Sequence, residues 1–293
     1  MRTIQLDYKN IESLNEDIAI CLGYFDGVHL GHQKLISEAV KNSKYKVSVL
    51  TFDKPISSLI NNGKSSEIIT SLDDRFKVIS RLNADYYFVM HIDNEFLNMS
   101  SNDFISLLKK LNVKEVYVGE DFRFGKDAKG SINELKESFK TTIVELLSKN
   151  NKKISAQDIV KYLKNGELEE AKVLLGRNYL ISGVVSKGKG IGHTIGFPTM
   201  NLKTFSNYVL PKFGVYKTIA YLDNVPHISI TNVGIRPTVN GEYPTIEVYI
   251  PGFNEDAYDR NLSVEFLEFI RPEMKFSSLN ELKRQIQNDL KKV

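Results

Sequence analysis

A short segment near the N-terminus, rich in glycine and histidine, has the residue types of a phosphate-binding turn. It covers residues 23–32 with the sequence GYFDGVHLGH, between an apolar run and a stretch of helical periodicity. The first N–H groups of a helix lack intrahelical partners and carry the positive end of the dipole, so a helix start favours an anion. His29 and His32 are three residues apart on one helical face, where both can donate hydrogen bonds to phosphoryl oxygens. The segment therefore predicts a phosphate site.

Two other interpretations of these histidines stay open. An isolated H-x-G-H pattern fits a glycine-punctuated turn with two solvent-exposed histidines about equally well, and its place between strand and helix is what favours phosphate. A zinc site would need further cysteine or histidine ligands, and the chain has one Cys and five His without a second cluster.

A second candidate site lies in the C-terminal third. Residues 183–192, GVVSKGKGIG, lack Walker A spacing and by themselves predict a flexible hairpin. Residues 196–201 follow with the sequence GFPTMN, in which Thr199 and Asn201 are two apart. In an extended segment, which Pro198 favours, these two side chains point the same way, and their neutral oxygens suit Mg²⁺. The alternative is an Asx or Ser/Thr turn at a strand end.

The elements before residue 150 alternate between strand-like and helix-like patterns, which is typical of a doubly wound parallel sheet. Ser71 with Asp74 and Ser100 with Asp103 have capping-box spacing and support two helix starts. The expected strands are Ile18–Gly23, Lys46–Phe52, Tyr86–Met90, Glu115–Gly119 and Thr142–Leu147, and the expected helices are His29–Lys41, Ser71–Leu82, Ser100–Leu111 and Ser131–Lys140.

After residue 179 the pattern changes to brief β-rich runs separated by Gly, Pro and Asn, which favours a small antiparallel barrel. The helical stretches Ala156–Lys164 and Leu168–Leu175 bridge the two halves, and Leu279–Leu290 predicts a final helix. The strands of the barrel are expected at Val184-Val185, Val215–Leu222, Ile228–Val233, Ile246–Ile250 and Leu262–Phe269.

Composition limits the class of protein. With 42% hydrophobic and 26% charged residues, the 293-residue chain is an ordinary globular sequence, long enough for two domains. We expect no signal, anchor or membrane span, because no apolar run approaches about 18 residues. The single cysteine, Cys21, lies in an apolar run and fits a reducing cytoplasm. The net charge is +3 with both signs interspersed, so we expect no nucleic-acid partner; the oligomeric state stays open.

The chain resembles the prokaryotic bifunctional riboflavin kinase/FMN adenylyltransferase family, also called FAD synthetase, over about Ile18 to Leu290. Beside residues 23–32 and 196–201, the matching segments are VGEDFRFG at 118–125, NVGIRPT at 232–238, TIEVY at 245–249 and IRPE at 270–273. The resemblance implies an α/β doubly wound nucleotidyltransferase-like domain over residues 1–178. A small antiparallel β-barrel of riboflavin kinase type, with a C-terminal helix, would follow over residues 179–293.

The resemblance also implies two reactions with ATP as co-substrate and Mg²⁺ as cofactor. One phosphorylates riboflavin to FMN, with Glu247 as the base that takes the proton of the 5′-hydroxyl. The other joins FMN to the α-phosphorus of ATP, giving FAD and pyrophosphate, with His29 and His32 as donors. By resemblance, the nucleotide-binding residues are Gly23, Phe25, Asp26, Gly31, Asp121, Gly188 and Gly190, the metal ligands are Thr199 and Asn201, and Arg271 lies near the substrate. A glutamate that alternates with apolar residues on a strand otherwise indicates only a solvent-facing position.

The chain departs from the family pattern at several places. The family stretch S-S-T-x-I-R is SAQDIV at 155–160, and T-F-D/E-P-H-P is TFDKPI at 51–56, so an arginine and a histidine are missing. Lys54 or Arg123 could supply replacement charge. In the kinase half the departures are His193, Tyr249 and Asp259, where arginine, histidine and glycine are common.

Two alternatives to the bifunctional enzyme therefore remain. One is a riboflavin kinase with a degenerate adenylyltransferase domain, because the missing arginine removes a charge from the phosphate site. The other is a non-catalytic flavin or RNA sensor on the same scaffold.

Overall fold

The structure is a computed structural model, and it describes residues 1–60, 66–145, 147–149, 152–188, 196–238 and 241–293. The chain divides into two compact units. The first consists of Met1–Ile68 with Leu72–Ala156, and the second of Gln157–Val293 with Ile69–Ser71. The domain boundary that the sequence predicts after residue 178 stays a prediction.

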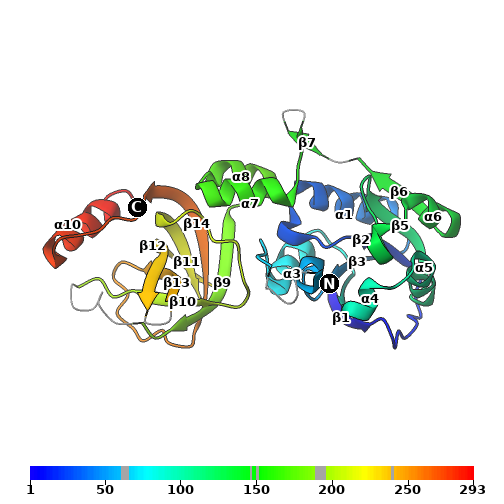
Figure 1. Cartoon of the computed structure of the whole chain (residues 1–293), viewed down its shortest axis with the longest axis horizontal. Helices are drawn as coiled ribbons and strands as arrows, with labels where there is room; N and C mark the ends of the chain where they lie inside the picture. The colour runs from blue at the N-terminus through cyan, green and yellow to red at the C-terminus, as the bar shows by residue number, and fades with distance from the viewer. Residues whose placement is uncertain (61–65, 146, 150–151, 189–195, 239–240) are drawn as a thin grey trace. The chain divides into compact units, whose positions relative to one another are not determined.

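The first unit is built on a six-stranded sheet in which every neighbouring pair is parallel (Figure 1). Its strand order is β1-β4-β3-β2-β5-β6. The strands are β1 (Arg2–Asp7), β2 (Ile18–Leu22), β3 (Lys46–Phe52), β4 (Tyr86–His91), β5 (Val113–Gly119) and β6 (Lys140–Val144). The sequence analysis did not assign β1, an edge strand whose two apolar residues, Ile4 and Leu6, give only a short alternation and of which only Leu6 is buried.

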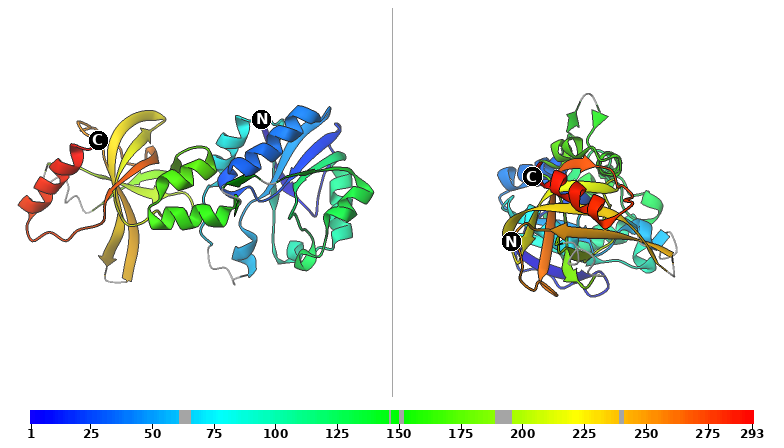
Figure 2. Two further views of the ribbon diagram at one scale, coloured as in Figure 1. Left: turned by 90° about the horizontal axis from the view of Figure 1, so that it is seen from above. Right: turned by 90° about the vertical axis from the view of Figure 1, so that its left-hand side faces the viewer.

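Helices cover both faces of this sheet, as Figure 2 shows. Side chains alternate across β2, so Ile18, Ile20 and Leu22 pack on one face while Ala19 and Cys21 pack on the other. The principal helices are α1 (Leu30–Asn42), α3 (Leu72–Ser80), α5 (Ser101–Lys110) and α6 (Ile132–Ser138). Short helices are η1 (Asp26–Val28), α2 (Ile56–Ile60), α4 (Asn94–Leu97) and η2 (Lys126–Ala128). The doubly wound prediction is confirmed.

The strand order reverses direction at β2. The chain moves from β2 to β3 and β4 on one side, and later to β5 and β6 on the other. In open α/β sheets, ligands bind beyond the carboxyl ends of the strands at such a switch point. The loops that follow β2 and β5 are therefore where a site is expected.

The second unit is a closed barrel of six strands, in the order β10-β13-β12-β11-β14-β9, and all pairs are antiparallel. Its strands are β9 (Tyr179–Ser186), β10 (Met200–Thr204), β11 (Gly214–Leu222), β12 (Val225–Thr238), β13 (Gly241–Tyr249) and β14 (Asn261–Arg271). The helices are α7 (Ala156–Asn165), α8 (Leu168–Leu175) and α10 (Leu279–Leu290). A small hairpin, β7 (Ser148–Lys149) and β8 (Lys152–Lys153), belongs to the first unit. The barrel and its final helix confirm the predicted fold class.

Several barrel strands are longer than the apolar runs indicate. Strand β12 extends to both sides of the expected Ile228–Val233, because the barrel pairs its polar residues with β11 and β13 as fully as its apolar ones. Such ladder bonds depend on neighbouring strands and leave no mark in local hydrophobicity.

Candidate nucleotide sites

The turn after β2 has an unusual backbone. Phe25 (φ 56°), Gly27 (φ 72°) and Val28 (φ 41°) all adopt positive φ angles. For a β-branched valine this conformation is rare, and such strain is concentrated at functional sites. The chain leaves this turn through His29, which is extended and caps the start of α1. Gly23 and Asp26, both predicted nucleotide-binding residues, belong to the same turn.

His29 and His32 form a compact pair at this helix start. Their rings are stacked with centroids 3.6 Å apart, and the His29 Nδ1 accepts a hydrogen bond of 3.3 Å from the His32 backbone N–H. Only 6% of His29 is exposed, so the interpretation of two solvent-exposed histidines is wrong. Within the described part of the chain, no three His, Cys, Asp or Glu residues gather as metal ligands, so the zinc interpretation has no ligand set there.

His32 is held in its neutral form. Burial lowers its pKa well below the ordinary value, and the charges of nearby His29, Arg75 and Lys153 lower the pKa further. The buried Nδ1 of His32 has no hydrogen-bond partner among the described residues. A neutral imidazole keeps one N–H and one acceptor nitrogen, so it can donate to a phosphate oxygen without carrying charge.

Two predicted glycines lie close against aromatic rings of this turn. A Cβ on Gly31 would lie 3.2 Å from the His29 ring, and one on Gly23 would lie 3.1 Å from the Phe25 ring. Such distances are tighter than ordinary Cβ contacts, so side chains here would push the rings away. The glycines therefore allow the aromatic groups to close over the turn.

Asp121 lies on the loop after β5, at the other side of the switch point. Its carboxylate forms an ion pair with Lys153 of β8. Lys153 also acts electrostatically on His32. The sequence analysis did not single out Lys153, although it lies two residues before the altered segment 155–160, which was the available signal.

Arg75 of α3 is the second residue that the sequence missed. It is 1% exposed, and its guanidinium donates to the backbone oxygen and the hydroxyl of Tyr24 and to the hydroxyl of Thr51. An arginine directly after two helical aspartates normally indicates a solvated face, so the sequence carries no signal of its burial.

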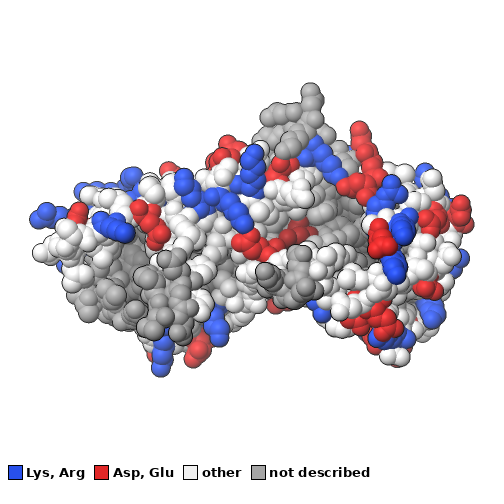
Figure 3. All heavy atoms as spheres, viewed as in Figure 1, with Lys and Arg blue, Asp and Glu red and all other residues white. Residues whose placement is uncertain are grey.

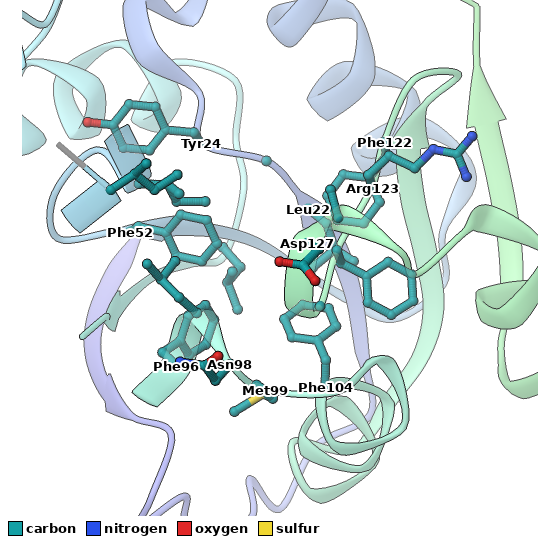
Figure 4. Close-up of a pocket in the computed structure, with 18 of the residues that line it drawn as sticks. Leu22, Tyr24, Phe52, Phe96, Asn98, Met99, Phe104, Phe122, Arg123 and Asp127 are labelled. Atoms are coloured by element: carbon teal, nitrogen blue, oxygen red, sulfur yellow. The ribbon is translucent and has the colours of Figure 1, made fainter. Parts of the chain in front are cut away.

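A cavity of about 800 Å³ opens beside this turn. Its lining is mostly apolar, as in small-molecule sites, with polar groups contributed by the loop after β5. The apolar lining includes Leu22, Leu50, Phe52, Phe96, Met99, Phe104 and Phe124. Figure 4 shows the Asp127 carboxylate pointing into the cavity and the Arg123 guanidinium pointing away from it. The other suggested replacement cation, Lys54, lies 3.8 Å from the Asp53 carboxylate.

In the barrel, strand register brings together residues that are far apart in sequence. Asn201 of β10 pairs directly with Glu247 of β13, and Glu247 pairs on its other side with Asn232 of β12. Directly opposite residues have Cβ atoms about 5 Å apart. The neighbours Ile246 and Val248 are buried, so the row Asn201–Glu247–Asn232 faces away from the barrel interior. Asn232 lies within the NVGIRPT segment, but its role in this row depends on pairing.

Gly188 of the glycine-rich segment and Thr199 lie next to this row. A Cβ on Gly188 would collide with the side-chain amide of Asn201, so the backbone at Gly188 lies directly against that side chain. Gly190 and His193 lie outside the described residues. Thr199 lines a cavity of about 370 Å³ together with Pro198 and Tyr258.

The structure accounts for one departure from the family pattern. Asp259 stands where glycine is common and has φ 62°, in the left-handed region. Glycine adopts this conformation readily, and aspartate is among the other residues that tolerate it. The substitution therefore keeps the turn. Tyr249, at another departure, packs its ring edge against Phe197, with centroids 5.4 Å apart.

Arg271, the predicted substrate contact, is engaged with the C-terminal helix. Its guanidinium donates to both carboxylate oxygens of Asp289 on α10, at 2.8–3.0 Å, and 3% of the Asp289 side chain is exposed. These contacts tie α10 to β14. A role for Arg271 in substrate binding stays a prediction.

Charge and hydropathy add two observations. On the face drawn in Figure 3, the described Lys and Arg side chains are interspersed with Asp and Glu. No helix among the described residues is long and apolar enough to cross a membrane.

An α/β unit with a phosphate-type turn, joined to a closed barrel with paired Asn and Glu, defines a two-domain transferase that uses nucleotides. The comparisons with known proteins agree. Residues 11–158 match the family model described as FAD synthetase, and residues 175–293 match the one described as riboflavin kinase.

Full-length relatives share this arrangement. The bifunctional riboflavin kinase/FMN adenylyltransferase of Bacillus subtilis is 35% identical, covering 99% of this chain and 96% of the relative. Its Escherichia coli K12 counterpart is 32% identical with the same coverage. A crystal structure titled as a macrolide-efflux protein from Streptococcus pneumoniae superposes with a TM-score of 0.89 and 29% identity, covering 99% of this chain and 98% of that one.

The chain belongs to the bifunctional riboflavin kinase/FMN adenylyltransferase family. It is a kinase and nucleotidyltransferase of flavin biosynthesis, the route from riboflavin through FMN to FAD, and it uses ATP.

Proposed function

We propose that each unit carries one complete active site, so that the first unit adenylylates FMN and the second phosphorylates riboflavin. The observation that supports this most directly is the stacked histidine pair at the start of α1, together with a cavity of about 800 Å³ with an apolar lining that the same turn reaches through Gly23 and Tyr24. A flavin needs an apolar slot for its ring system and a polar end for its phosphate. Both kinds of surface meet at this turn.

In the first unit, a phosphate oxygen of FMN attacks the α-phosphorus of ATP. A P–O bond forms to the FMN oxygen while the bond to the bridging oxygen breaks, and pyrophosphate leaves. Catalysis of this kind depends on positioning and charge stabilisation. Neutral His32, His29 and the first amides of α1 are the donors for the phosphoryl oxygens, and Gly23 and Gly31 allow close approach.

The charge that the missing family arginine would supply needs a replacement. Lys153 supports this role better than Lys54 or Arg123 do, because it pairs with Asp121 and acts on His32. Arg123 points away from the cavity. Lys153 is a point charge without a bidentate fork, so we expect adenylylation to be the slower of the two reactions.

In the second unit, Glu247 takes the proton of the riboflavin 5′-hydroxyl as that oxygen attacks the γ-phosphorus of ATP, and ADP leaves. A positioned carboxylate of this kind acts as a general base. Asn201 faces Glu247 across the ladder, and Gly188 lies on the Asn201 amide, which favours a nucleotide close to this row.

The neutral oxygens of Thr199 and Asn201 fit Mg²⁺, which takes few protein ligands together with phosphate oxygens and water. When bound, the ion neutralises phosphate charge and orients the γ-phosphoryl group. Glu247 then needs only to be within reach of the flavin hydroxyl.

The test is to incubate the purified full chain with riboflavin, ATP and Mg²⁺ and to separate the flavins by chromatography. FMN together with FAD supports the proposal. FMN alone, also when FMN is the starting flavin, supports a riboflavin kinase with a degenerate first unit, which the segment SAQDIV at 155–160 favours. Unchanged riboflavin would overturn the catalytic proposal and favour a sensor.

A further inference from the structure

Arg75 is a buried cation directly behind the turn that follows β2. Its Nη1 donates to the Tyr24 backbone oxygen and to the Thr51 hydroxyl, both at 3.1 Å, and its Nη2 donates to the Tyr24 hydroxyl at 2.9 Å. The guanidinium also lies 4.2 Å from the centre of the Tyr24 ring. Two of these partners belong to the residue that precedes the strained turn.

A charge in this position is costly for stability. The Asp26 carboxylate forms an ion pair with Nη2 at 4.0 Å, and the guanidinium also contacts the oxygens of Tyr24 and Thr51 and the Tyr24 ring. Apolar residues of similar volume often stabilise a protein as well as or better than a buried charge. The contacts of Arg75 with Tyr24 and Thr51 therefore bear on the conformation of the turn and not on core stability alone.

The Tyr24 carbonyl is fixed by two donors. It accepts the Thr51 hydroxyl at 2.7 Å and the Arg75 Nη1 at 3.1 Å. In a planar trans peptide the C=O and the following N–H point in opposite directions. Because Arg75 and Thr51 hold the carbonyl on their side, the Phe25 N–H points to the opposite side, and no other described residue accepts a hydrogen bond from it.

We propose that Arg75 is a positioning residue of the adenylyltransferase site, which holds the Tyr24–Phe25 peptide so that the Phe25 N–H faces the phosphate oxygens of ATP. This inference rests on the proposed function of the first unit. The positive φ of Phe25 supports it, because an unrestrained loop would relax from that conformation. Arg75 acts through the backbone and touches no substrate.

The experiment compares Arg75→Ala and Arg75→Lys with the wild-type full chain in the conversion of FMN to FAD, over a range of ATP concentrations. Loss of one preorganised donor typically costs about a hundredfold, so kcat/KM for ATP should fall by about that factor in Arg75→Ala. Arg75→Lys keeps the charge without the fork and should lie between the two. Arg81→Ala, an exposed arginine just beyond α3, is the matched control and should keep wild-type activity.

A second measurement separates positioning from simple loss of structure. Free guanidinium, added at millimolar concentration to Arg75→Ala, should restore part of the adenylylation rate, while methylammonium should not. If Arg75→Ala fails to fold, Thr51→Val removes the other donor to the same carbonyl and should lower kcat/KM for ATP about tenfold, as expected for a weaker neutral hydrogen bond.

The outcomes are distinct. A folded Arg75→Ala with wild-type kcat and KM would overturn the role of Arg75 and leave the proposed function intact. A loss that neither lysine nor guanidinium relieves, together with an unaffected Thr51→Val, would assign Arg75 to folding alone. A wild-type chain that makes FMN but no FAD would overturn adenylylation itself, and this inference with it.

Discussion

The two units build their nucleotide sites in different ways. The first relies mainly on backbone groups, those of a turn with three positive φ angles and of a helix start, and a stacked pair of histidine side chains lies beside them. The second relies on side chains that antiparallel register places opposite one another, Asn201, Glu247 and Asn232. The geometry of a turn can be altered by substituting a residue that only supports it. A row of side chains on paired strands is altered mainly by substituting the residues of the row themselves.

The chain departs from the family pattern in both units, and this difference explains why the departures need not abolish either reaction. The first site spreads phosphate binding over several backbone donors, so one missing arginine weakens it without removing it. The second concentrates proton transfer on one carboxylate. Substitutions in the two sites should therefore lower the reaction rates by different factors. A substitution in one site should leave the reaction of the other site unchanged.

The largest effect is expected for Glu247→Gln. A general base contributes about 10²–10⁴-fold, so riboflavin phosphorylation should fall by about a thousandfold, because the amide cannot take the hydroxyl proton. Conversion of FMN to FAD should be unchanged. Both rates are measured by separating the flavins, and Glu268→Gln, an exposed glutamate on β14, is the control. Equal loss of both reactions would contradict the independence of the sites.

His32→Gln should lower FMN adenylylation by about a hundredfold, because one preorganised donor is displaced from the phosphate site. Riboflavin phosphorylation in the same preparation should stay at the wild-type rate and so serves as an internal control. His91→Gln, an exposed histidine at the end of β4, is the matched variant and should keep both activities. FAD formation at the wild-type rate in His32→Gln would remove this histidine from the mechanism.

Asp289→Ala tests whether Arg271 is a structural residue or a ligand contact. Removing one partner of a buried pair typically costs about 3 kcal/mol, because the remaining charge loses its compensation. Thermal unfolding followed by circular dichroism should show this loss in the second unit, while KM for riboflavin stays unchanged in the folded enzyme. An unaltered melting curve with a raised KM would favour the ligand role.

The smallest effect concerns pH. The pKa of His32 is lowered in the folded chain, so at pH values below the ordinary pKa of 6.5 His32 becomes protonated in the unfolded chain but stays neutral in the folded chain. As the pH is lowered below about 6.5, the free energy of unfolding should therefore decrease, by at most about 1.4 kcal/mol per pH unit from this group. The decrease should end once the pH falls below the pKa of His32 in the folded chain. Urea unfolding at pH 7 and pH 5.5 measures this slope. His32→Gln should have a shallower one, and identical slopes would contradict the burial of a neutral His32.

The sequence by itself determined the alternation of strands and helices in the first unit, the change to a barrel and the residues of both motifs. These features are local: apolar periodicity fixes the element type, and glycines mark the turns. The positions of Gly23, Gly31, His29 and His32 around one turn follow from their closeness in the chain.

Only the tertiary structure decided which distant residues meet. Arg75 lies in a helix whose sequence indicates a solvated face, yet folding buries it behind Tyr24. Strand pairing places Asn232 opposite Glu247, and Arg271 forms an ion pair with Asp289. Burial and register are properties of neighbours that the folded chain supplies, so no local pattern can carry them.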